Sequence, residues 1–64
     1  MISEDEEYLA FLRVEHHHHM LESNRAFVNA VAASTKRVID EWTKIGMYHD
    51  DKIKEYACLI EKFK

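Results

Sequence analysis

The chain of 64 residues contains no proline and only one glycine, so few positions can interrupt a helix. Gly46 is the one residue that adopts a left-handed backbone conformation without steric cost. It follows Trp42-Thr43-Lys44-Ile45 and precedes Met47, an order typical of a helix that ends with glycine in the left-handed region. The sequence therefore predicts that a central helix ends at Ile45 and that a turn occupies residues 46–50.

The chain also lacks a second cysteine and a long apolar run. Cys58 has no partner for an intramolecular disulfide, and together with the lack of a signal-peptide pattern this predicts a reducing, cytoplasmic setting. No apolar stretch approaches the ~20 residues that span a bilayer, so no membrane partner is expected. A chain this short buries only ~60% of the surface of its unfolded form, and oligomerisation or a metal is a usual remedy.

Two sequence signals predict where helices begin. Ser3-Glu4-Asp5-Glu6 is a capping box, so a helix is expected from about Glu4. Asp50 can cap a last helix over about residues 51–63, where apolar side chains recur at helical spacing.

A break or a kink is expected within residues 15–24. Apolar side chains before and after this stretch lie on different arcs of a helical wheel, and one straight helix does not turn both arcs toward the same core. The histidines and the pair Ser23-Asn24 are weak helix formers, and Ser23 or Asn24 can serve as the N-cap of a new helix. Nothing there forces a break, so one continuous helix stays an alternative.

The segment 26–33 is apolar on every side except Asn29, which predicts that it is buried all round. The chain carries more large apolar side chains than two or three short helices can bury, and the excess indicates a subunit interface. We therefore predict a single all-α domain, a helical hairpin or a three-helix bundle, completed by homodimerisation around this segment. The predicted interface residues are Phe27, Val28, Ala30, Val31, Trp42, Tyr48 and Tyr56.

Charge is unevenly distributed along the chain. Residues 1–24 carry six acidic side chains and one basic side chain, a balance of −5, whereas residues 25–64 carry six acidic and eight basic side chains, a balance of +2. An acidic first segment beside a basic remainder favours packing of the two against each other, within one chain or between two copies.

Four consecutive histidines at positions 16–19 are the one constellation that suggests chemistry. On a helix, three- and four-residue spacings place carboxylates and imidazoles of this stretch on one ridge. Such ligands bind Zn²⁺ or a related divalent ion. The predicted metal ligands are Glu15, His18, His19 and Glu22. Surface histidines that form no site are the alternative.

The sequence contains no strained nucleophile turn, no phosphate-binding glycine loop and no CxxC pair, so no enzyme activity is predicted. A pI near 5.9, with acids interspersed among the lysines, disfavours nucleic-acid binding, which stays a second alternative. We predict a small non-catalytic interaction or regulatory module that binds a second copy of itself or another protein. The first alternative is a metal-binding helical bundle that uses the histidine-carboxylate ridge, and no other cofactor is predicted.

Overall fold

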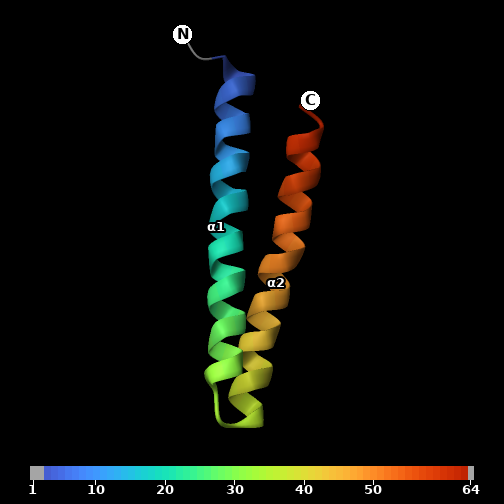
Figure 1. Cartoon of the computed structure of the whole chain (residues 1–64). Helices are drawn as coiled ribbons and strands as arrows, with labels where there is room; N and C mark the ends of the chain where they lie inside the picture. The colour runs from blue at the N-terminus through green and yellow to red at the C-terminus, as the bar shows by residue number, and fades with distance from the viewer. Residues whose placement is uncertain (1–2, 64) are drawn as a thin grey trace.

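The computed structural model describes residues 3–63 and shows two long antiparallel helices packed side by side (Figure 1). Helix α1 spans Glu4–Ala32 and helix α2 spans Lys36–Glu61. The molecule is a rod, with principal extents of 51 × 18 × 12 Å. The predicted all-α hairpin is therefore confirmed, whereas the three-helix arrangement is wrong.

The start of α1 matches the capping box. The Ser3 Oγ accepts a hydrogen bond from the backbone N–H of Glu6 at 3.2 Å, which satisfies one of the free donors of the first turn. Four acidic side chains, those of residues 4–7, occupy that turn. Their negative charge lies at the positive end of the helix dipole, where it stabilises the helix.

The turn predicted at residues 46–50 and the separate last helix at 51–63 are wrong, because α2 runs through all of them without interruption. No glycine in the described residues has a positive φ. Gly46 is buried, and a Cβ atom added to it would lie only 2.7 Å from a ring carbon of Phe27 in α1. The glycine is needed for close approach of the two helices rather than for a left-handed turn.

The break or kink expected at residues 15–24 is also absent, since α1 is continuous from Glu4 to Ala32. Ser23 caps no new helix: its hydroxyl donates to the Oδ1 of Asp50 at 2.5 Å. Asp50 in turn caps no helix, because it lies inside α2. The two polar residues satisfy each other across the hairpin, and the pairing explains why neither interrupts its helix.

The chain reverses at residues 33–35, which contain neither glycine nor proline. Ala33 and Thr35 both have extended backbones, with ψ values of 147° and 144°. At the start of α2, the Ile39 N–H donates a hydrogen bond to the carbonyl of Thr35, the residue before the helix, at 3.0 Å. In the sequence, the only local signal is that the apolar run ends at Ser34-Thr35, residues that favour turns and helix N-termini.

The helices meet along a narrow seam of side chains at coiled-coil spacing. Within the described residues, α1 buries Leu12, His19, Ser23, Ala26 and Ala30, whose separations of seven, four, three and four residues follow a 3.5-residue period. Small residues occupy the seam near the turn, where the ribbons lie close together, and the helices separate toward the termini (Figure 1). Near the termini, the partly exposed rings of Tyr8 and Phe63 meet with centroids 5.8 Å apart.

No helix in the described part of the chain combines the length and the hydrophobicity needed to cross a bilayer.

Candidate functional site

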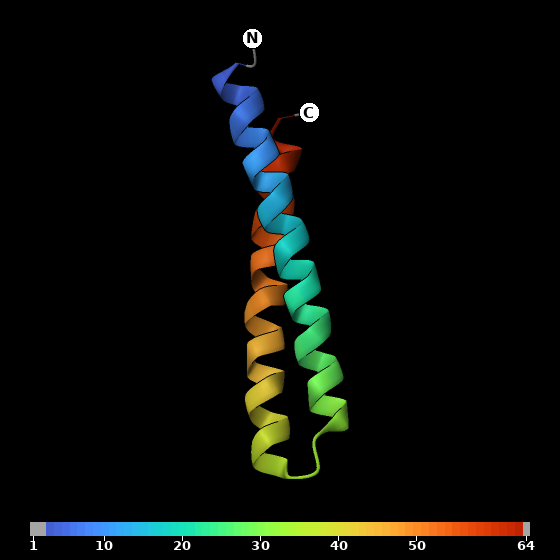
Figure 2. The ribbon, with the colours of Figure 1, turned by 90° about the vertical axis from the view of Figure 1, so that its left-hand side faces the viewer.

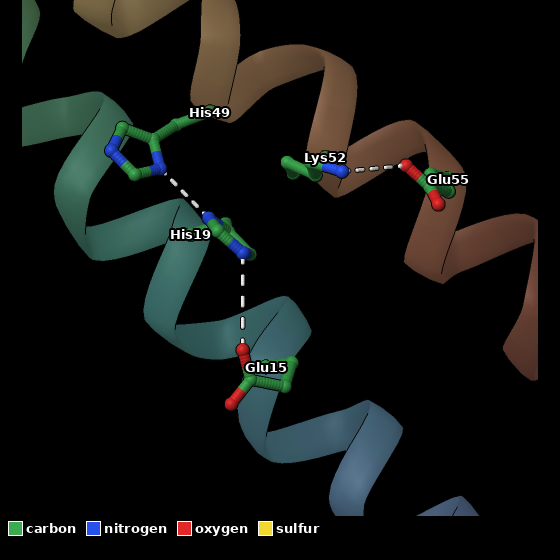
Figure 3. Close-up of polar contacts among 5 residues, drawn as sticks. All are labelled: Glu15, His19, His49, Lys52 and Glu55. Carbon is green, nitrogen blue, oxygen red and sulfur yellow. Dashed lines mark hydrogen bonds and ion pairs between the residues drawn. The ribbon is translucent and has the colours of Figure 1, made fainter.

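His19 is the centre of a polar cluster between the two helices (Figure 3). Its side chain is buried, and its Nδ1 lies 2.7 Å from the Nδ1 of His49 on α2. Its Nε2 lies 3.9 Å from a carboxylate oxygen of Glu15, one turn earlier in α1. On α2, the ring of Tyr56 stacks on the His19 ring at a centroid distance of 5.6 Å. The neighbouring Ser23–Asp50 hydrogen bond extends this cluster toward the turn.

The pKa of His19 is lowered from its ordinary value, chiefly because burial disfavours the charged imidazolium. Repulsion by His49 and His18 lowers it further, and Lys52 on α2 adds a smaller effect, whereas the Glu15 carboxylate opposes the shift. Geometry leads to the same preference. An Nδ1–Nδ1 hydrogen bond requires one protonated nitrogen and one lone pair, so both rings cannot be protonated at these positions at once.

The lowered pKa predicts that acid destabilises the hairpin. Below about pH 6.5, the ordinary pKa of histidine, the unfolded chain binds a proton at His19 more readily than the folded chain does, so the free energy of unfolding falls as the pH drops. Above that pH, His19 is neutral in both the folded and the unfolded chain, so its contribution to the free energy of unfolding is constant. Urea unfolding at pH 7.5 and pH 5.5 measures how much free energy of unfolding is lost on acidification. We expect this loss to be smaller in His19→Gln than in the wild-type protein, and equal losses in the two proteins would contradict the assignment.

The predicted metal ridge is only partly assembled. Glu15 and His19 approach each other, but His18 is exposed and its ring meets that of His19 edge-on. Glu22 is half-buried. Among residues 3–63, no three His, Cys, Asp or Glu side chains come together in a group that could hold a metal ion. Metal binding by this ridge therefore stays a prediction, and the metal content of protein purified without a chelating resin would test it.

The predicted interface residues divide into two groups. Phe27, Ala30, Trp42 and Tyr56 are buried or half-buried within the hairpin, where Ala30 belongs to the seam with α2. In contrast, Val28, Val31 and Tyr48 are exposed, by 58%, 89% and 55%. The expectation that segment 26–33 is buried all round is thus not met within one chain: Ala26 and Ala30 are buried, whereas Val28, Val31 and Ala32 are exposed.

The outer side of α1 carries a second apolar stripe that sequence reasoning missed. Five of its seven residues are apolar and two are polar, at alternating separations of four and three residues: Ala10, Val14, His17, Leu21, Asn24, Val28 and Val31. All seven residues are exposed, and none belongs to the buried seam. The sequence carries the signal: the switch of apolar arc within residues 15–24 belongs to one continuous helix with two apolar faces rather than to a kink.

Figure 2 looks onto the side of α1 that faces away from α2, and no other segment covers it. Near the turn, this surface is hollowed between Phe27, Val28, Val31 and Ala32, and the hollow is entirely apolar. A stripe of this period with one uncovered face is typical of a helix that pairs with another helix.

Comparison with known proteins finds no matching family model, no matching curated protein and no matching solved structure.

Proposed function

We propose that this chain is a non-catalytic helical interaction module that acts as a homodimer. The observation that carries the proposal is the uncovered outer stripe of α1, which runs along nearly the whole helix. In the described residues, thirteen large apolar side chains are exposed, five of them on α1 from Val14 onward. Surface of this extent is unusual on a protein that remains alone in water, because contiguous apolar patches favour association.

The exposed area supports the same proposal. The hairpin exposes 5159 Å². A compact monomer of 7.6 kDa would expose roughly 4300 Å² by the usual scaling of area with mass. The excess of roughly 900 Å² is close to the ~800 Å² that each partner buries in a standard protein–protein interface. One more copy of the hairpin is therefore sufficient to cover it.

The polar cluster around His19 supports a binding function over a catalytic one. Among the described residues, no buried side-chain nitrogen or oxygen lacks a hydrogen-bond partner. His19 is paired with His49, and Ser23 is paired with Asp50, so these groups stabilise and align the hairpin.

A charge placed on the outer stripe tests the proposal. We expect wild-type protein to sediment at twice its chain mass of 7.6 kDa and Val28→Glu to weaken association at least tenfold, because a carboxylate would be buried in an apolar contact. Met47→Glu is the matched control, since Met47 on α2 is equally exposed, at 58%, but lies outside the stripe. Sedimentation equilibrium over micromolar concentrations measures both. A wild-type protein that remains at its chain mass throughout would contradict the proposal.

A further inference from the structure

We infer that the second copy pairs along the outer stripe of α1 in antiparallel orientation, with the two-fold axis near Leu21. This inference rests on the proposed homodimer and specifies its geometry. The outer stripe, defined above as the seven residues from Ala10 to Val31, is the contact surface on both copies.

The stripe is nearly symmetric about Leu21. Val14 and Val28 each lie seven residues from it, and the polar residues His17 and Asn24 lie between, at four and three residues. Antiparallel pairing about this point places Val14 of one copy at the Val28 end of the other, and both polar residues come close to the axis. Large apolar side chains thus meet large apolar side chains at both ends.

The shapes of the two ends of α1 are complementary in this orientation. Val14 lies on the stripe in the first half of the helix and is 65% exposed. The apolar hollow in the second half is lined by Phe27, Val28, Val31 and Ala32. Antiparallel pairing brings Val14 of one copy over the hollow of the other, which Val28 lines. Parallel pairing would leave both hollows opposite each other.

Charge favours the same orientation. The first turn of α1 carries Glu4, Asp5, Glu6 and Glu7, and a parallel pair would gather eight such carboxylates at one end. The first turn of α2 has no acidic residue and begins with Lys36-Arg37, cations that are unfavourable at a helix N-terminus. From Leu21, a rise of 1.5 Å per residue places the acids about 21–26 Å away and Ala32 about 17 Å away. In the antiparallel pair, the acids of one copy therefore lie beside the basic turn of the other.

Disulfide trapping distinguishes the two orientations. In a Cys58→Ser background, we expect Leu21→Cys to form a disulfide-linked dimer under mild oxidation because the two positions 21 meet near the axis. Val14→Cys alone and Val28→Cys alone should not link, since like positions are about 21 Å apart across an antiparallel pair. A mixture of the Val14→Cys and Val28→Cys proteins should give the mixed disulfide. Met47→Cys is the control for random collision.

Each outcome is decisive. Efficient self-linking of Val14→Cys and of Val28→Cys would show a parallel pair and overturn this inference while the homodimer stands. A dimer in sedimentation that none of the stripe cysteines can trap would place the interface elsewhere and would also overturn it. A monomer in sedimentation would instead remove the proposed function itself.

Discussion

Replacing Gly46 by valine is expected to destabilise the hairpin by about 1–3 kcal/mol, the usual cost of overpacking a well-filled interior. Even a single methyl group at this position would lie 2.7 Å from the ring of Phe27, closer than carbon atoms can approach. Valine adds two further methyl groups, so the ring must move or the helices must separate. A chain of 64 residues has a total stability of roughly 3–10 kcal/mol, so the loss is a substantial fraction.

A double-mutant cycle identifies the cause. In the background of Phe27→Ala, the ring is gone, and Gly46→Ala should then stabilise by about 1 kcal/mol because alanine is the better helix former. In the wild-type background the same substitution should gain less or cost stability. Thermal and urea unfolding of the four proteins measures the coupling. Additive effects would mean that the contact between Phe27 and Gly46 does not set the helix spacing.

Leu12→Ala is expected to have the largest effect of any single truncation, about 2–5 kcal/mol, as is usual for a buried leucine. Leu12 is the one large side chain among the described residues that is completely buried. It belongs to the seam in the half of α1 nearer the N-terminus. The variant should lose most of its helical circular dichroism near body temperature, because the expected loss is comparable to the total free energy of unfolding of a chain of this length.

Met47→Ala is the matched control for Leu12→Ala. It removes a side chain of similar size from a position that is 58% exposed on α2, so a change within about 0.5 kcal/mol is expected. Urea unfolding at a fixed protein concentration compares the two variants, and the concentration must be equal because association adds to apparent stability. Similar losses in both would indicate that burial at residue 12 does not hold the hairpin together.

Sequence reasoning succeeded where the structural cause is local. The capping box at Ser3 works through a hydrogen bond to a residue three positions away, so its residues alone predict the start of α1. The all-helical class agrees with the composition, because proline and glycine interrupt helices and the chain has no proline and only one glycine. The surplus of apolar side chains was also visible, although its division into two faces of α1 was not.

The structure corrected each prediction that depended on a residue in the other helix. Ser23 and Asp50 both favour helix N-termini when considered singly, yet across the hairpin they form one hydrogen bond and lie in helix interiors. His19 was assigned to a surface ridge with His18, but the approach of His49 from α2 turns it into a buried group with a lowered pKa. Neither pairing has a signature in local sequence, because the partners are 27 and 30 residues apart.

Gly46 shows most clearly what the sequence determined and what only the tertiary structure decided. The sequence established that position 46 is exceptional, since it is the only residue without a side chain. Glycine serves either to adopt a left-handed backbone or to admit a close neighbour, and local sequence cannot separate the two uses. In the structure, the ring of Phe27 on α1 packs over Gly46, so the glycine admits a close neighbour. The turn lies at residues 33–35 instead of at the glycine. The physical reason is that a missing Cβ removes two steric constraints, one on the backbone conformation and one on the approach of neighbouring groups. Which of them matters depends on what lies beside the glycine in space.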